Sequence, residues 1–261
     1  NQVAVLRADE EFLLNTKYGV TILSHVGSIG GDVLETNFES TFTTALTKNP
    51  PTPPPPPAPR DGSFREVGEM GVGRSSHTAT LLTNGTVLIA GGFSISTAVT
   101  ETAEIYNPTA EEFSDAPDDL STARGFHAAL RLADGRVLIP GGIAGSSLSE
   151  TDSAEVYDPS SGTFSFAGTM TKARAFHTMT LLTDKRVLIA GGSVPGPNGA
   201  FSSRTAEVYS PATGTFTALP DMAVYRAGHT ATRLGSGEVL LAGGNGTDTR
   251  CEIFDPSTET F

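Results

Sequence analysis

Short apolar runs bounded by turn residues recur along the last three quarters of the chain. Four of them are nearly identical, at residues 87–90 (VLIA), 137–140 (VLIP), 187–190 (VLIA) and 239–242 (VLLA). A continuous apolar run of about four to eight residues between Gly, Asn or Asp is typical of a strand that is buried on both faces. The pattern therefore predicts a repeated all-β unit.

Each run lies inside a longer pattern that predicts four strands per unit. In the first unit these are TATLL (78–82), VLIAGG (87–92) and AEIY (103–106), followed by a fourth strand after a further turn. In the second unit the fourth strand follows the turn DPSSGTF and ends near GTM. The Asn-Gly and Asp-Gly pairs between the first two strands predict two-residue hairpin turns with positive φ at both central positions.

The same residue types recur at fixed places in all four units. An Arg opens each unit, a His follows it by three residues, and a Gly pair ends the second strand; successive units are separated by 50, 50 and 52 residues. A Glu-x-Tyr or Glu-x-Phe strand and a Phe then follow in the same order. The repeated positions are Arg74, His77, Gly91 and Gly92; Arg124, His127, Gly141 and Gly142; Arg174, His177, Gly191 and Gly192; and Arg226, His229, Gly243 and Gly244.

These motifs resemble the Kelch repeat family, in its bacterial and galactose-oxidase-like branch. The resemblance covers about residues 61–261, with repeats that begin near 74, 124, 174 and 226. It departs from the common pattern at Phe164 and Phe216, where Kelch units often have Trp. The resemblance implies an all-β, Kelch-type β-propeller, in which each repeat is one blade of four antiparallel strands.

The recurring His and Arg allow two interpretations. Four symmetry-related histidines could converge on a metal ion, or each His and Arg could bond to the backbone of the neighbouring blade because the blade itself is repeated. We favour the structural role for all 16 repeated positions, and we expect no metal and no cofactor. The glycines would allow close approach of the backbone or positive φ.

The ends of the repeat region leave the number of blades open. GSFREVGEMGVGR (62–74) aligns with GTFSFAGTMTKAR (162–174), which predicts the fourth strand of a blade at the start of the region, while the fourth repeat reaches Phe261 without its own fourth strand. The N-terminal strand could complete the last blade and close a ring of four. The alternative is a fragment of a larger ring, which we prefer because Phe261 is an abrupt stop.

Two different segments precede the repeats. Residues 1–48 contain three strand-like stretches, at 2–8, 18–26 and 39–46, which predict a β-rich arm that pairs with another subunit or belongs to an upstream domain. Residues 49–60 are dominated by proline and predict a stiff linker, about 3.1 Å long per residue.

Composition excludes some partners. The net charge of −12 opposes binding to nucleic acids and to anionic membrane surfaces. No apolar run reaches the roughly 18 residues that a spanning helix needs, so we expect no direct membrane insertion. The single cysteine, Cys251, cannot form an intrachain disulfide.

The alternative function is that of an enzyme. Galactose-oxidase-like copper chemistry implies a Cys cross-linked to a Tyr, a second Tyr and two non-repeated histidines. Here Cys251 occupies a repeated strand position, and His25 is the one His outside the repeats. The expectation is therefore that the chain is not an enzyme, unless the catalytic parts of a propeller enzyme lie outside it.

The longest variable segments follow the Gly pairs, at 93–102, 143–153 and 193–205. Loops on a rigid scaffold commonly carry binding residues. In the third segment Phe201 and Arg204 are candidate ligand-binding residues, since aromatic and Arg side chains often anchor partners; Phe201 could instead pack its own loop. The sequence thus predicts a non-catalytic, secreted or cell-surface module that binds a protein or a glycan, or that is displayed in a surface assembly or filament.

Overall fold

The computed structural model is all-β, with several antiparallel sheets and no helix among the residues that it describes. Those residues are 17–22, 38–43, 65–94, 99–145, 148–196, 199–244 and 249–261. The chain forms two compact units, Asn1–Arg65 and Glu66–Phe261. No helix in these ranges is long and apolar enough to cross a membrane.

The first unit contains one antiparallel strand pair. β1 (Lys17–Ile22) pairs with β2 (Phe38–Thr43), with Lys17 opposite Thr43 and Ile22 opposite Phe38. The two strands fall within or one residue outside the strand-like stretches expected at 18–26 and 39–46. The stretch expected at 2–8 and the proline-rich segment 49–60 lie outside the described residues.

The second unit repeats one antiparallel sheet along the chain, and the strand order within each sheet follows the sequence. The first sheet consists of β4 (Thr78–Leu81), β5 (Val87–Ala90), β7 (Ala103–Asn107) and β8 (Glu112–Asp115). The second consists of β10 (Leu130–Arg131), β11 (Val137–Pro140), β14 (Ser153–Asp158) and β15 (Thr163–Thr169). The third consists of β16 (Thr178–Leu181), β17 (Val187–Ala190), β20 (Ala206–Ser210) and β21 (Thr215–Ala218). The fourth has three strands, β22 (Thr230–Arg233), β23 (Val239–Ala242) and β24 (Glu252–Phe254).

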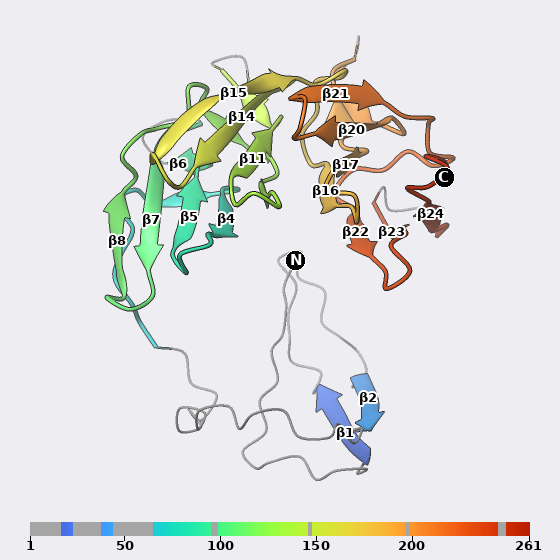
Figure 1. Cartoon of the computed structure of the whole chain (residues 1–261), viewed down its shortest axis with the longest axis horizontal. Coiled ribbons are helices and arrows are strands. Elements are labelled where there is room, and N and C mark those ends of the chain that lie inside the picture. The colour runs from blue at the N-terminus through green and yellow to red at the C-terminus, as the bar shows by residue number, and fades with distance from the viewer. Residues whose placement is uncertain are drawn as a thin grey trace. The chain divides into compact units, whose positions relative to one another are not determined.

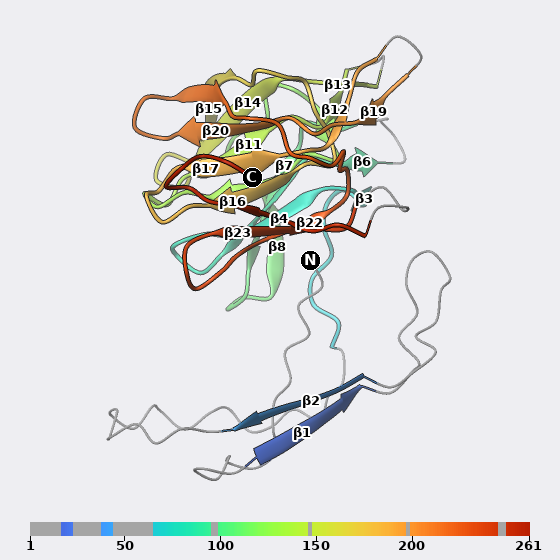
Figure 2. The same cartoon turned by 90° about the vertical axis from the view of Figure 1, so that its right-hand side faces the viewer.

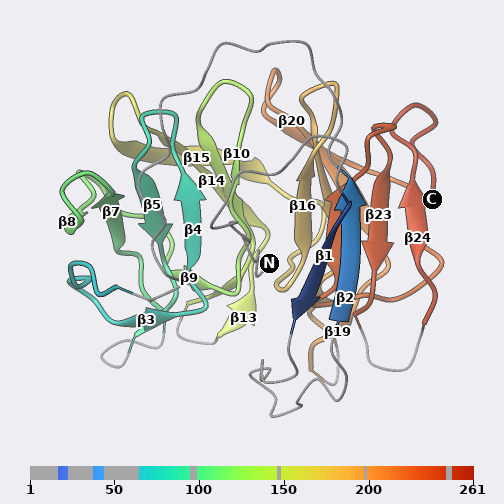
Figure 3. The same ribbon diagram turned by 90° about the horizontal axis from the view of Figure 1, so that it is seen from below.

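The four sheets follow one another along an arc, with their first strands on its inner side (Figure 1). Along this inner side β4 contacts β10, β10 contacts β16 and β16 contacts β22. Seen from below, β4, β5 and β7 of the first sheet lie side by side, as do β23 and β24 of the fourth (Figure 3).

Apolar side chains fill the spaces between successive sheets. On β11, Val137 and Ile139 pack in a cluster with Leu88 of the first sheet, whereas Leu138 packs in a cluster with Val187 of the third. Successive side chains of a strand point to opposite faces, so one central strand supplies two cores. This arrangement explains why VLIP and its counterparts are apolar at every position.

The turn between the first two strands of each sheet differs from the sequence prediction. Leu82 N donates to Thr86 O and Gly85 N donates to Leu82 O, and only Gly85, at +87°, has a positive φ in this turn. The connection is therefore a three-residue loop whose third residue is left-handed, a Gly in three sheets and Lys185 in the third sheet, and the two-residue prediction was wrong. Asn84 stays at negative φ because its side-chain oxygen accepts hydrogen bonds from the Thr86 N–H and hydroxyl.

The described parts of the segments after the Gly pairs include short strands. In each of the first three repeats a two-residue strand there pairs with another short strand, and these strands gather on one side of the main sheets (Figure 2). They are β3 (Arg74–Ser75) with β6 (Phe93–Ser94); β9 (Arg124–Gly125), β12 (Ile143–Ala144) and β13 (Ser149–Glu150); and β18 (Ser193–Val194) with β19 (Phe201–Ser202).

Residues 65–73 form no strand, although the sequence predicts the fourth strand of a blade at this point. The segment instead bonds to the first sheet, where Gly68 N donates to Glu111 O and Gly71 N donates to the carboxylate of Glu104. Since it pairs with no strand among the described residues, its backbone groups bond to partners that the first sheet offers.

Candidate functional site

The repeated Arg joins three parts of its own repeat. In the second repeat the buried Arg124 donates to the Gly141 carbonyl at 2.7 Å and pairs with Glu155 at 2.9 Å. Glu155 also accepts hydrogen bonds from the backbone N–H groups of Ser121 and Thr122. The equivalent buried pairs are Arg74–Glu104 at 2.6 Å, Arg174–Glu207 at 2.8 Å and Arg226–Glu252 at 3.0 Å.

The repeated His joins one repeat to the next. His127 Nε2 lies 3.0 Å from Thr78 Oγ1 of the preceding repeat, and His229 Nε2 lies 2.9 Å from Thr178 Oγ1. From the sequence, both Arg and His are expected to bond to the backbone of the neighbouring blade. That expectation was wrong in its partners, because the Arg side chain reaches carbonyls of its own repeat and the His ring reaches a Thr hydroxyl.

The repeated Gly pair lies against these side chains. A Cβ on Gly141 would stand 2.4 Å from the Arg174 carbonyl oxygen and 2.9 Å from the ring of His177. Gly142 has φ +98°, and its N–H donates to the same Arg174 carbonyl at 2.8 Å. The pair thus combines a close approach between repeats with a backbone conformation that other residues rarely adopt.

His177 breaks the pattern. Its buried Nε2 lacks a hydrogen-bond partner among the described residues, whereas an unpartnered Nδ1 is common to all four repeated histidines. The position that holds Thr78 and Thr178 in the first and third repeats holds Ala128 in the second, so no hydroxyl faces the His177 ring. The first strand of that sheet is also shorter there, since β10 begins at Leu130 whereas β4 begins at Thr78.

Burial keeps these histidines neutral. Loss of solvation, with the charge of the adjacent Arg124 as the next cause, lowers the pKa of His127 to about 3. The same two causes, with Arg226 as the neighbour, lower the pKa of His229 to about 4. Burial and Arg174 place the pKa of His177 well below its usual range.

A ladder of backbone hydrogen bonds runs across the repeats between each Arg and His. Phe126 N donates to Ser76 O, Phe176 N donates to Phe126 O, and Gly228 N donates to Phe176 O. All four residues have φ between +53° and +64°. The Phe126 and Phe176 rings stack with their centroids 4.3 Å apart. This ladder, like the His contacts, joins repeat to repeat.

A groove of about 450 Å³ lies beside the short strands of the third repeat. Its lining brings the two predicted residues together, Phe201 from β19 and Arg204 just after it, and adds Lys172, Asp221 and Tyr225. Phe201 and Tyr225 are each 50 % exposed. A volume in this range is typical of ligand sites.

Arg204 contacts two other residues that line this groove. Its Nε lies 3.0 Å from an oxygen of Asp221, and its guanidinium carbon lies 5.8 Å from the centre of the Tyr225 ring. Phe201 rests on its own loop, because a Cβ on Gly196 would stand 2.5 Å from the ring. Phe201 nevertheless stays half exposed.

Sequence reasoning found Phe201 and Arg204 but missed Tyr225, Lys172 and Asp221. Alignment on the repeated Arg provides the missing signal: the position of Tyr225 holds Gly or Ala in the other three repeats. Arg204 likewise stands where the first and second repeats have Glu101 and Asp152. Arg204 and Tyr225 thus depart from the repeat, whereas Asp221 aligns with Asp119 in the first repeat.

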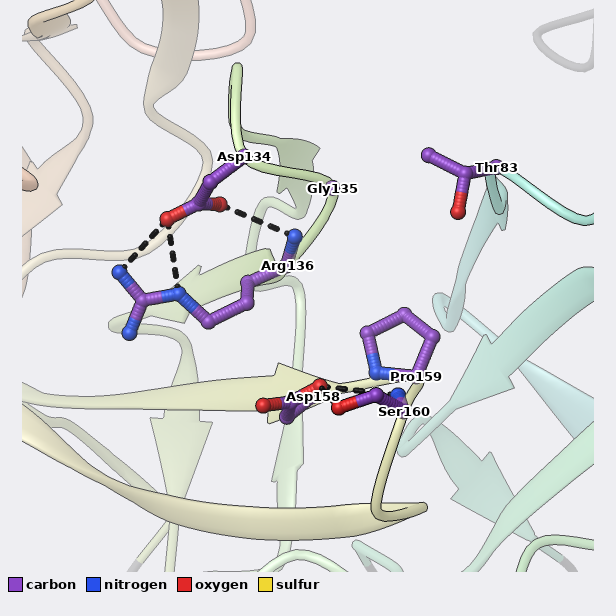
Figure 4. A pocket seen from close by; sticks show the side chains of 7 residues that line it. All are labelled: Thr83, Asp134, Gly135, Arg136, Asp158, Pro159 and Ser160. Atoms are coloured by element: carbon purple, nitrogen blue, oxygen red, sulfur yellow. Dashed lines mark hydrogen bonds and ion pairs between the residues drawn. The ribbon is translucent and has the colours of Figure 1, made fainter.

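A second hollow lies between the first two repeats, at the turns opposite the short strands (Figure 4). It measures about 330 Å³ and is lined by Asp134, Arg136, Asp158 and Ser160, among others. Arg136 pairs with Asp134 at 2.8 Å, and Ser160 donates to Asp158 at 2.6 Å. These partners belong to the same turns, so the polar groups of this hollow stabilise local structure.

Within the described ranges, no three His, Cys, Asp or Glu side chains are gathered as metal ligands would be. Cys251 is an exposed free thiol. His25, the non-repeated histidine, lies outside those ranges.

Comparison with known proteins supports the fold alone. No protein-family model and no curated protein matches the chain. Among solved structures, that of YjhT is similar to this chain with a TM-score of 0.57 and 15 % sequence identity. The similarity covers 67 % of this chain and 60 % of YjhT, so the chain spans less than two thirds of that structure. The comparison therefore agrees with an all-β fold of several antiparallel sheets.

Proposed function

We propose that the second unit is a Kelch-type β-propeller module, either a ring of four blades or part of a larger ring, that binds a protein or a glycan and catalyses no reaction itself. The four-fold sequence repeat, the successive antiparallel sheets and their arrangement along an arc support the architecture. A secreted or cell-surface location and a place in a surface assembly stay predictions from the sequence.

The groove at Phe201, Arg204 and Tyr225 is the observation that carries the binding function. The repeated Arg side chains are engaged in contacts within the fold, because each of them is bound to a Glu and to carbonyl groups of its own repeat. The groove residues, in contrast, are about half exposed and are not part of these contacts. Exposed aromatic and Arg side chains around a hollow are typical of binding surfaces.

The proposal is tested by screening the purified chain against a glycan array and a displayed peptide library. A variant with Phe201→Ala and Arg204→Ala should lose the ligands that the wild type retains and should melt at the same temperature. Retention of every ligand by this variant would place binding elsewhere. The matched control is Asp134→Asn with Arg136→Ala, which alters the hollow at the opposite turns and should leave binding unchanged.

A further inference from the structure

The groove beside β19 has the chemistry of a site for an acidic sugar, and this inference rests on the binding function proposed above. We propose that it binds a hexuronate residue of an acidic glycan. Three features of the lining carry the proposal, namely two half-exposed aromatic rings, a donor and an acceptor held side by side, and a positive charge. Each feature matches a different part of a uronate pyranose ring.

The aromatic rings match the apolar face of the sugar. Phe201 and Tyr225 come from segments more than 20 residues apart and line one groove, each with 50 % of its surface exposed. A pyranose ring has a face of C–H groups that packs on an aromatic ring, while its hydroxyl groups point outwards around the edge. Two rings in a hollow of about 450 Å³ can hold such a face without occupying the polar groups.

Arg204 and Asp221 match the hydroxyl groups. The Arg204 Nε lies 3.0 Å from Asp221, and its guanidinium carbon lies 5.8 Å from the centre of the Tyr225 ring. About half of each charged side chain remains exposed, at 47 % for Arg204 and 43 % for Asp221. A planar donor beside a carboxylate acceptor can bond to two adjacent hydroxyl groups, one accepting and the other donating.

The positive charge of Lys172 would pair with the carboxylate of the sugar. Lys172 lines the same groove, is exposed, and forms no hydrogen bond or ion pair with the part of the chain that the structure describes. Arg204 and Asp221 balance each other, so Lys172 leaves the lining with a net charge of +1 in a chain of net charge −12. The second repeat has Thr122 at this position and the fourth has Val224, so the lysine is a departure from the repeat.

Calorimetric titration of the whole chain tests the proposal with trisaccharides of galacturonate, mannuronate and guluronate, each compared with its methyl ester. The ester keeps the ring and removes the charge. We expect at least one uronate to bind and its ester to bind about tenfold or more weakly, as loss of a charge-assisted hydrogen bond implies. Absence of binding by all three acids at millimolar concentration, or equal binding of acid and ester, would overturn the proposal.

Variants of two residues sharpen the test. Lys172→Gln should weaken uronate binding about tenfold and Lys172→Arg should restore most of it, because the arginine keeps the positive charge. Tyr225→Ala should weaken binding of acid and ester alike, because it removes a ring and no charge. Lys185→Gln, in a turn at the opposite end of the third sheet, is the control and should change nothing. A Lys172→Gln variant that binds the acid as tightly as the wild type would also overturn the assignment.

Failure of the sugar assignment and failure of the binding function give different results. If the uronates do not bind but a library peptide is lost in the Phe201 and Arg204 variant, the ligand class is wrong and the binding module stands. If no ligand of any kind depends on Phe201 and Arg204, the proposed function fails as well.

Discussion

Thr78 Oγ1 and His127 Nε2 lie 3.0 Å apart and join the first repeat to the second. The same bond between Thr178 and His229 joins the third repeat to the fourth. Between the second and third repeats it is missing, because Ala128 replaces the Thr and leaves Nε2 of His177 without a partner among the described residues. A buried polar group without a partner lowers stability.

Ala128→Thr should therefore stabilise the protein. The new hydroxyl gives His177 the partner that His127 and His229 have, and one such hydrogen bond contributes about 1 kcal/mol. The free energy of unfolding, measured with urea, checks this value. Ala128→Val is the matched control, since Val has nearly the shape of Thr without its hydroxyl; if Val stabilises as much as Thr, the missing hydrogen bond is not the cause.

Glu155→Gln should destabilise the protein strongly. The Arg124 side chain is fully buried, so the substitution leaves its charge without a balancing carboxylate, which costs about 3–5 kcal/mol. Urea unfolding measures the loss. Asp134→Asn breaks an ion pair whose side chains are 35 % and 45 % exposed and should cost about 1 kcal/mol or less. Equal losses in the two variants would contradict the structural role of Arg124.

Stability should fall as the pH falls from about 6.5 to 5. Folding lowers the pKa of His127 to about 3 and that of His229 to about 4, and it lowers the pKa of His177 as well. The unfolded chain binds protons near pH 6.5 whereas the folded chain does not. The contribution of these histidines to the free energy of unfolding is therefore fully present above pH 6.5 and is lost progressively as the pH falls below it.

Each such histidine contributes up to about 1.4 kcal/mol per pH unit in this window. Ordinary carboxylates, which titrate near pH 4, remain mostly charged there. Urea unfolding at pH 7, 6 and 5 should therefore show a falling free energy of unfolding. A free energy that stays constant from pH 7 to 5 would mean that the ring nitrogens can accept protons in the folded state.

The strands and their repeat could be predicted from the sequence because the apolar pattern determines them. Val137, Leu138 and Ile139 are apolar in succession since two cores lie on either side of β11. The turn type could not be predicted from the Asn-Gly pair alone, because the side chain of Asn84 holds its backbone at negative φ through bonds to Thr86. Hydrogen bonds between a side chain and the nearby backbone therefore determine the type of this turn.

The binding groove was only half predictable. Phe201 and Arg204 could be proposed because they belong to an irregular segment after a Gly pair. Tyr225 could not, because it comes 21 residues after Arg204 and lies beside it only in the folded chain. The partners of the repeated Arg were mistaken for a similar reason, since sequence spacing does not reveal whether a side chain turns toward its own repeat or the next.

Deletion of residues 1–48 should yield a soluble, monomeric second unit, whereas the intact chain should associate. The reason is the number of apolar side chains in a segment too short to bury them without a partner sheet. Sedimentation velocity over a range of concentrations distinguishes the two states. An intact chain that stays monomeric at high concentration, with its arm cleaved rapidly by protease, would refute the assembly role.

We infer that the repeated residues build the fold and that the groove residues, among which Arg204 and Tyr225 depart from the repeat, bind the ligand. A comparison of Gly191→Val with the Phe201→Ala, Arg204→Ala variant, in thermal melting and in ligand binding, tests both parts of this claim. Gly191 has φ +61°, and a Cβ there would stand 2.6 Å from the Arg226 carbonyl oxygen. We predict that Gly191→Val unfolds a sheet and lowers the melting temperature steeply, while the groove variant melts like the wild type and loses its ligand. A groove variant that melts as early as Gly191→Val would contradict the claim.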